Sequence, residues 1–305
     1  MIKMFCVGDN NVDIYEHTNM VYPGGSCVNA AAVACMNGHQ ASFVSSVGTD
    51  KLGDLQLDSL ATLGVDVSHA HRIDEQTAYC FISLDNGERI FGHNNTGARE
   101  KRPLSVEDIR LGQNGDWDLL YTCIDAYYDE GAMEQFGKSE LPAICDFTTH
   151  WTEESLSIEC IYFDYPYLSC ENLTEQEVMN LLNRCVHEWG AKLAIGTMGL
   201  RGSIAYNGRK FYYQEAYPVK AVDTLGAGDS FLSTFTVLYF DGKKMLDDWI
   251  SKIDGWDENS PSYIASIDRL IEKSLSFAAL RAARTCQDFG AFGFGIPFEK
   301  YMVKE

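Results

Sequence analysis

The stretch Asp223-Thr224-Leu225-Gly226-Ala227-Gly228-Asp229-Ser230-Phe231 joins two glycines and an acidic residue to the start of an apolar run. The run continues as Leu232-Ser233-Thr234-Phe235-Thr236-Val237-Leu238, which predicts a buried helix. Gly226 and Gly228 leave backbone N–H groups uncrowded, and the positive end of the helix dipole faces the same turn. We therefore expect the turn of Gly226, Ala227 and Gly228 to stabilise developing negative charge.

Asp229 lies in the first turn of this expected helix, beside the anion-binding turn. A carboxylate in that position could take a proton from a substrate hydroxyl as its oxygen attacks a phosphorus atom. The pattern therefore indicates phosphoryl transfer. Judged on these residues alone, the alternative is a glycine-rich turn capped by Asp229, because short glycine motifs recur by chance.

The segment resembles the C-terminal signature of the PfkB/ribokinase-type carbohydrate kinases, Asp-Thr-x-Gly-Ala-Gly-Asp, and matches it in full. A second family element is Gly24-Gly25-Ser26-Cys27-Val28-Asn29-Ala30-Ala31-Ala32-Val33-Ala34, preceded by Val7-Gly8-Asp9-Asn10-Asn11-Val12-Asp13. A third, Gly196-Thr197-Met198-Gly199-Leu200-Arg201-Gly202-Ser203, resembles the nucleotide loop Thr-x-Gly-x-x-Gly. All three stand in family order, so the resemblance covers nearly the whole chain.

The resemblance implies a ribokinase-like α/β fold: a doubly wound, mostly parallel sheet with helices on both faces and a small antiparallel β lid. It implies ATP and Mg²⁺ as cofactors, and it leaves open a monovalent cation and a homodimer through the lid. The residues expected to carry the transfer are Asp229 as base and the anion hole of Gly226, Ala227 and Gly228. The residues expected to line the sugar are Asp13, Gly25 and Asn29. Those expected at the ATP phosphates or ribose are Thr197, Gly199 and Gly202.

Without the resemblance, Asp13 is better explained as a turn residue and Asn29 as a polar group on a helix face. The chain contains no Gly-x-x-x-x-Gly-Lys-[Ser/Thr] pattern, which excludes a P-loop mechanism. The signature also lacks the third glycine of a dinucleotide-binding fingerprint, which disfavours a dehydrogenase. A region rich in alanine, residues 274–288, leaves room for an adenine ring or forms a close-packed helix.

Three segments resemble the fructoselysine 6-kinase branch most closely: residues 8–15, 89–92 and 146–151. Many sugar kinases of the family carry Asp-Pro-Asn-x-Arg in mid-chain, and only Asp146 of that pattern is present here. The expected reaction is ATP-dependent phosphorylation of a primary hydroxyl, converting fructoselysine to fructoselysine 6-phosphate. The alternatives are a kinase for another small sugar, such as fructose or ribose, and a non-catalytic regulator that binds sugar or nucleotide.

The metal site is less defined. Family members present Asn-x-x-Glu after a mid-chain strand, where it organises magnesium waters, and Asn172-Leu173-Thr174-Glu175 matches a few residues later than expected. Glu175 is accordingly a candidate near the metal. The other interpretation is a capped helix start with Glu175 in its first turn.

Composition favours one domain spanning residues 1–305, with 46% hydrophobic residues to build its core. A net charge of −20 argues against a nucleic-acid partner, which needs a cationic surface, but does not exclude ATP, because distant carboxylates are screened over roughly 8–10 Å. The ten cysteines form no Cys-x-x-Cys pair, and Cys27 is expected to be a packing residue. We expect a cytoplasmic protein without a signal peptide or membrane span.

Apolar runs alternate with helical patterns, which predicts a parallel sheet with helices on both faces and ligands at the carboxyl ends of the strands. The expected strands are residues 4–8, 41–48, 119–124, 143–147, 159–163 and 192–196, and the expected helices 26–38, 51–64 and 174–190. Two regions, 12–23 and 77–97, break the alternation. The pair 77–84 and 89–94 is joined by Asp85-Asn86-Gly87-Glu88, a hairpin signal. These regions are expected to form the lid, with an ordinary edge hairpin as the alternative, and residues 241–268 an acidic surface insertion.

Overall fold

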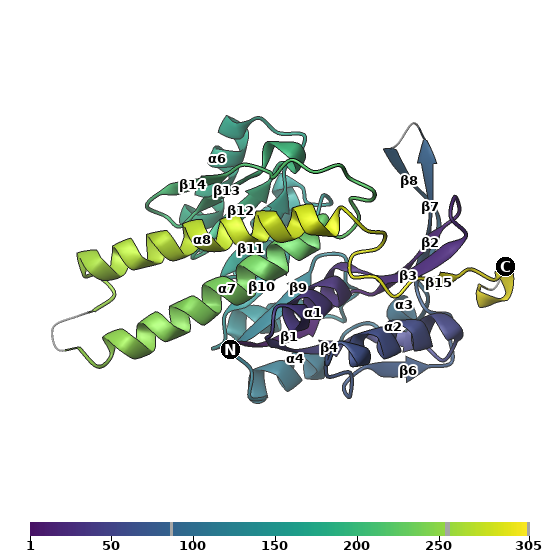
Figure 1. Ribbon diagram of the computed structural model, residues 1–305. Coiled ribbons are helices and arrows are strands. Elements are labelled where there is room, and N and C mark those ends of the chain that lie inside the picture. The colour runs from purple at the N-terminus through teal and green to yellow at the C-terminus, as the bar shows by residue number, and fades with distance from the viewer. Residues whose placement is uncertain (86–87, 254–256, 304–305) are drawn as a thin grey trace.

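The computed structural model describes residues 1–85, 88–253 and 257–303. Its centre is an eight-stranded sheet in the order β14-β13-β12-β11-β10-β9-β1-β4 (Figure 1). The strands are β1 (Lys3–Val7), β4 (Gln40–Val44), β9 (Leu119–Cys123), β10 (Ala143–Asp146), β11 (Tyr165–Ser169), β12 (Ala194–Thr197), β13 (Ser203–Tyr206) and β14 (Phe211–Gln214). Pairing is parallel from β4 to β12 and antiparallel only from β12 to β14.

Helices cover both faces of this sheet, as a right-handed path through parallel strands requires. The longer helices are α1 (Ser26–Met36), α2 (Lys51–Thr62), α4 (Val106–Asn114), α6 (Glu175–His187), α7 (Ala227–Ile250) and α8 (Pro261–Thr285). The shorter ones are α3 (Gly97–Lys101), α5 (Glu153–Glu159) and the 3-10 turns η1 (Met133–Lys138), η2 (Cys160–Tyr162), η3 (Gly199–Arg201) and η4 (Lys300–Met302). The β1, β4 and β9 strands are buried almost throughout, which explains their continuous apolar runs.

The expected α/β fold is confirmed, with one strand divided and one misplaced. The single strand expected at 41–48 is β4 followed by a separate short strand, β5 (Ser46–Gly48), outside the central sheet. Residues 159–163 were expected to form a strand, but they hold the end of α5 and η2, and the strand follows as β11. A short apolar run does not distinguish strand from helix. The true strand contains Pro166, a residue that lacks a backbone donor and is rare in interior strands, so its sequence argued against the correct assignment.

The two regions expected to form the lid belong to a second sheet, in the order β15-β3-β2-β7-β8, which we call the lid (Figure 1). Its strands are β2 (Asn11–Tyr15), β3 (Met20–Gly24), β7 (Tyr79–Asp85), β8 (Glu88–Asn95) and β15 (Ile296–Pro297). The β2 and β7 strands pair in parallel because the chain completes α1, β4 and α2 before returning; the other pairs are antiparallel. The expected turn residues Asn86 and Gly87 lie outside the described residues. A separate pair, β5 (Ser46–Gly48) with β6 (His71–Ile73), lies near the base of the lid.

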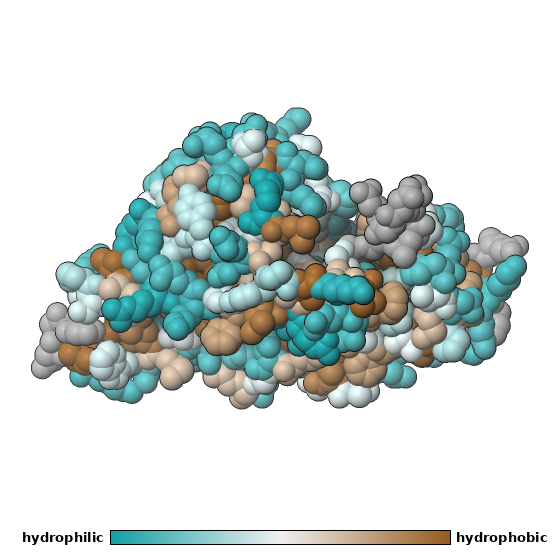
Figure 2. Space-filling view, turned by 45° about the horizontal axis from the view of Figure 1, so that its top comes forward, coloured by the Kyte–Doolittle hydropathy of each residue, from teal (hydrophilic) through white to brown (hydrophobic). Residues whose placement is uncertain are grey.

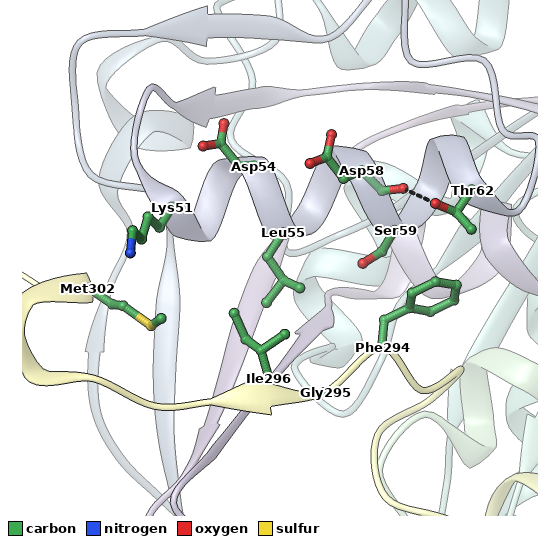
Figure 3. Close-up of a pocket in the computed structure, with 10 residues that line it drawn as sticks. All are labelled: Lys51, Asp54, Leu55, Asp58, Ser59, Thr62, Phe294, Gly295, Ile296 and Met302. Atoms are coloured by element: carbon green, nitrogen blue, oxygen red, sulfur yellow. Dashed lines mark hydrogen bonds between the residues drawn. The ribbon is translucent and has the colours of Figure 1, made fainter.

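The C-terminal segment packs on the lid face that bears Val12, Ile14 and Val21. Ile296 pairs with Val21, and the Gln76 side chain donates a hydrogen bond to the Met302 carbonyl at 2.8 Å. Between this segment and α2 lies a groove of about 510 Å³, into which Leu55, Ile296 and Phe294 project (Figure 3). None of the residues expected in the active site lines the groove.

The two longest helices, α7 and α8, pack along each other as a hairpin whose far end projects from the sheet (Figure 1). The region 241–268, expected as a surface insertion, supplies this far end, apart from residues 254–256, which lie outside the described part. Within α8, Ala278 and Ala279 are buried in the core, as in the close-packed alternative. The view in Figure 2 shows apolar side chains interspersed among hydrophilic ones. Among the described residues, no helix combines the length and apolar character needed to cross a membrane.

Candidate active site

The signature forms a tight turn that leads into α7. Gly226 has φ = 73° and precedes the first helical residue, Ala227. A Cβ atom on Gly226 would lie 2.2 Å from the Cβ of Ala291, so both the left-handed backbone and the close approach require glycine. Gly228 is different, because no described atom outside its own helix and chain neighbours lies within 4 Å of a Cβ built there. The turn therefore presents its backbone to an open space at the start of the helix.

Asp229 meets Asn29 at the junction of α7 and α1. The Asn29 side-chain amide donates to Asp229 Oδ2 at 2.6 Å, across 200 residues of sequence. Asn29 itself is buried, and its Oδ1 atom finds no hydrogen-bond partner among the described residues. Since a buried acceptor without a partner is costly, this oxygen is a natural contact for a donor supplied by a ligand. The structure thus brings together the expected base and one of the expected sugar contacts.

The two consecutive glycines before α1 leave room for β2, the first lid strand, and for the residues just before it. A Cβ on Gly24 would lie 2.2 Å from Asp13 Oδ2, so glycine here makes room for the Asp13 carboxylate. Gly25 has φ = 102°, and its Cβ would meet the backbone of Asn10 and Asn11 at 2.8 Å. Asn11 also donates to Asp13 Oδ1 at 3.1 Å. Asp13 and Gly25 are accordingly packed together at the start of α1.

Acidic residues follow several neighbouring strands of the sheet. Asp9 comes after β1 and accepts from the Ser26 and Cys27 backbone N–H groups at 3.1 and 2.9 Å, which caps α1. Asp146 ends β10, where its Oδ2 accepts from the Ser26 hydroxyl at 3.0 Å. Asp125 lies two residues beyond β9 and contacts His150 at 2.7 Å. The carboxyl edge of the sheet is therefore strongly negative.

This crowding changes the acidity of two carboxyl groups. Loss of water raises the pKa of Asp229 above its usual range, and the neighbouring charges of Asp9 and Asp125 raise it further, against the hydrogen bond from Asn29. Burial likewise raises the pKa of Asp146, and so does the nearby Asp229. A raised pKa makes a carboxylate a better proton acceptor near neutral pH.

Thr197 ends β12, and Gly199 and Gly202 lie in the turn between β12 and β13, three strands away from β9. Gly199 has φ = 57°, and its Cβ would lie 2.6 Å from the Glu171 carboxylate. Gly202 has φ = 89°, and its Cβ would lie 2.0 Å from the Gln214 carbonyl. Both positions therefore require glycine for the turn itself, and the turn opens at the same carboxyl edge as the signature.

Glu175 is exposed in the first turn of α6. Thr174 accepts a hydrogen bond from the Glu177 N–H group, and the Glu177 side chain accepts one in return from the Thr174 N–H group. This is the capped helix start of the second interpretation. Glu171 lies nearer the nucleotide loop, beside Gly199. A role for Glu175 near a metal stays a prediction.

Cys27 is fully buried behind Gly8, and burial raises the pKa of its thiol to about 12. A neutral thiol in this position packs and does not act as a nucleophile. One oxygen of Asp9 and the sulfurs of Cys27 and Cys123 all lie within 4.8 Å of one another. All ten cysteines of the chain are free.

Residues 2–123 and 169–247 match the family described as pfkB family carbohydrate kinase. The chain belongs to this family. As a pfkB carbohydrate kinase it transfers a phosphoryl group to a sugar hydroxyl. The matched residues include the signature turn, α1 and the nucleotide loop, so the family match and the geometry converge on one edge of the sheet.

Individual pfkB kinases and related structures extend this similarity. The fructosamine kinase FrlD of Bacillus subtilis is 29% identical over 97% of this chain and 95% of its own length. The fructoselysine 6-kinase of Escherichia coli is 33% identical over 77% of this chain and 88% of its own. The structure of Arabidopsis thaliana ribokinase, solved with ribose and ATP, superimposes with a TM-score of 0.72 over 95% of this chain and 94% of that one, at 20% identity. The fold is therefore ribokinase-like.

Sequence reasoning missed several residues of this pfkB site. It gave no role to Asp9, which caps α1, or to Ser26, which reaches Asp146. Ala291, which backs the signature turn, also went unnoticed. A usable signal existed for Asp9 and Asp146, since acidic residues directly after predicted parallel strands share one edge of the sheet. Nothing in the local sequence marks Ala291, because its role depends only on packing against Gly226.

Proposed function

We propose that the protein transfers the γ-phosphoryl group of ATP to the 6-hydroxyl of fructoselysine, giving fructoselysine 6-phosphate. The observation that carries this proposal is the double role of Asn29. Its amide donates to Asp229, while its buried Oδ1 has no partner among the described residues. A sugar that donates one hydroxyl to this oxygen brings a second hydroxyl beside the base. In that position Asp229 takes the proton of the attacking hydroxyl.

The remaining expected residues surround this point. The N–H groups of the Gly226–Gly228 turn, at the positive end of α7, stabilise charge on the transferring phosphoryl group. Asp13 and Gly25 bind the sugar from the lid side. Thr197, Gly199 and Gly202 hold the nucleotide at the end of β12. Together these groups align the two reactants, which is most of what phosphoryl transfer needs from a protein.

Magnesium fits the oxygen donors at this edge. The carboxylates of Asp125, Asp146 and Glu171 are hard ligands of the kind that Mg²⁺ prefers, directly or through water. When bound to the ATP phosphates, the ion neutralises their negative charge. The protein side of the contact falls to Asp125 and Glu171 in this proposal, with Glu175 as a further candidate at the start of α6.

The preference for a fructosamine rests on charge and on similarity. Asp9, Asp125, Asp146 and Asp229 gather at one edge, where burial and then the neighbouring carboxylates raise the pKa of Asp146 and Asp229. A glycated lysine carries a cationic amine that free fructose lacks, and an acidic binding edge favours a cationic substrate over a neutral one. Relatives whose names specify fructosamine or fructoselysine match most of the chain, which supports the same substrate class.

The test is turnover of fructoselysine, free fructose and ribose with Mg²⁺ and ATP. We expect kcat/KM for fructoselysine to exceed the others by about 10- to 100-fold, because a lost charge-assisted hydrogen bond is worth roughly 1.5–3 kcal/mol. Equal or better use of fructose or ribose would leave only the broader sugar-kinase assignment. Absence of turnover with every sugar would favour the regulator alternative.

Three further expectations accompany this proposal. The lid, residues 12–23 and 77–97, closes over the sugar, so hydrogen exchange in both segments slows when sugar is added.

A homodimer forms through the lid edge, where Ile90 and Phe91 on β8 expose 47% and 61% of their surface. The molecular mass in solution tests this expectation. The protein acts in the cytoplasm, as its ten free cysteines favour. No nucleic acid or membrane partner is proposed.

A further inference from the structure

A buried hydrogen bond joins the lid to the signature. Tyr15 lies on β2, two residues after Asp13, so both side chains point to the same face of the lid. The Tyr15 hydroxyl donates to Asp223 Oδ2 at 2.5 Å, across 208 residues of sequence. The two residues are only 1% and 6% exposed. Because water has little access, breaking this bond removes one of the donors to a buried carboxylate oxygen without replacing it by water.

Asp223 is the residue that organises the turn before α7. Its Oδ1 accepts from the Leu225 N–H group at 3.0 Å, which shapes the approach to Gly226. Its Oδ2 also accepts from the Gly290 N–H group at 3.1 Å. The next residue, Ala291, fills the space against Gly226. One carboxylate therefore holds the anion-binding turn, the segment that backs it and the lid.

The ring of Tyr15 is held independently of its hydroxyl. It makes edge contacts with Tyr22 and Phe289, at centroid distances of 5.1 and 6.1 Å, and a tilted contact with His17 at 5.6 Å. Phenylalanine at position 15 would keep this packing. Tyr15→Phe therefore removes the hydroxyl that donates to Asp223 and keeps the ring contacts.

We propose that Tyr15 is a positioning residue that couples closure of the lid to the shape of the anion-binding turn at Gly226–Gly228. When the lid is closed, Tyr15 completes the donors around Asp223 and stabilises the turn. When the lid lifts, Asp223 loses that donor. By reciprocity, a phosphate group bound at the turn favours the closed lid, and a sugar bound at Asp13 favours the ordered turn. This inference rests on the proposed active site but not on the identity of the sugar.

The experiment measures hydrogen exchange of the lid strands β2 and β3 with and without a non-hydrolysable ATP analogue and Mg²⁺, in the absence of sugar. Wild type, Tyr15→Phe and Tyr79→Phe are compared. Tyr79 is a matched control, since it is also a buried lid tyrosine, but its hydroxyl meets His93 of the lid itself at 3.4 Å. Exchange in β4, which lies outside the lid, reports any general loss of stability.

We expect the analogue to slow exchange in β2 and β3 of wild type and of Tyr79→Phe. In Tyr15→Phe this slowing should be smaller by about 10-fold or more, because the variant lacks one charge-assisted hydrogen bond. An undiminished response in Tyr15→Phe, an equal loss in Tyr79→Phe, or no response in wild type would overturn the coupling. Failure of fructoselysine as a substrate would show only in turnover and would leave this result intact.

Discussion

The two ends of α7 carry similar side chains in opposite settings. At the first turn, Asp229 is half-buried beside Asn29, among other carboxylates, and its pKa is raised. At the far end, Asp247 and Asp248 pair with Lys243 and Lys252 one helical turn away; Asp248 is exposed, and the half-buried Asp247 also accepts from the Tyr263 hydroxyl. Each distal carboxylate therefore has a cation beside it. The comparison teaches that reactivity here comes from tertiary position and not from residue type.

The strongest test of this contrast replaces an aspartate at each end of the helix. Asp229→Asn keeps the shape and removes the base, so turnover should fall by about 10²–10⁴, with ATP binding by calorimetry largely retained. Asp248→Asn, at the exposed end, should leave turnover unchanged. Near-normal turnover by Asp229→Asn would remove the assignment of the base.

A second test compares the two glycines of the anion-binding turn. Gly226→Ala forces a side chain into left-handed backbone and against Ala291, so the free energy of unfolding should drop by about 1–3 kcal/mol. Gly228→Ala meets no nearby described atom and should retain stability in the same denaturant titration. Loss of turnover by Gly228→Ala at full stability would indicate close approach of the phosphoryl group. Equal destabilisation by both changes would contradict the packing seen at Gly226.

The pH dependence of kcat/KM tests whether the neighbouring carboxylates raise the pKa of Asp229. Asp229 must be ionised to accept a proton, so activity rises with pH through its raised pKa, and the acidic limb should lie above the usual range of an aspartate. Asp125→Asn removes a negative charge that raises this pKa, so the limb should move to lower pH. An unmoved limb would show that Asp125 and the base do not interact.

The smallest effect is expected at the distal end. Lys252→Ala breaks an exposed pair with Asp248, which should change the free energy of unfolding by less than about 0.5 kcal/mol, because such pairs are solvated and screened. Its kcat/KM should match that of wild type. A clear loss of activity would mean that the far end of α7 takes part in function after all.

Much of the fold was predictable because its signals are local. Glycines with φ > 0 at positions 25, 199, 202 and 226 mark turns that other residues strain to form, and these turns define the family motifs. The helix expected at 51–64 became α2, and that at 174–190 became α6. The short apolar run at 159–163 led to a wrongly expected strand, because such a run does not distinguish strand from helix. The proline in β11 made the real strand hard to recognise.

The site was predicted less completely than the fold. Asp229, Asn29, Asp13 and the glycine turns came from motif resemblance, and the structure places Asn29 against Asp229. Ser26 and Ala291 could not be found in this way, since each matters through a partner more than 60 residues distant. No short pattern encodes such a pair.

Neighbours along the chain decide the turns, the helix starts and most strands of this protein, because backbone dihedrals and side-chain periodicity depend on adjacent residues. The order of strands decides the rest. It places β1, β9 and β10 side by side and gathers their terminal carboxylates at one edge, so that burial and then the neighbouring charges raise the pKa of Asp146 and Asp229. It also brings Tyr15 of the lid to Asp223 of the signature. Electrostatic and hydrogen-bond energies depend on distance in space, and only the folded chain sets those distances.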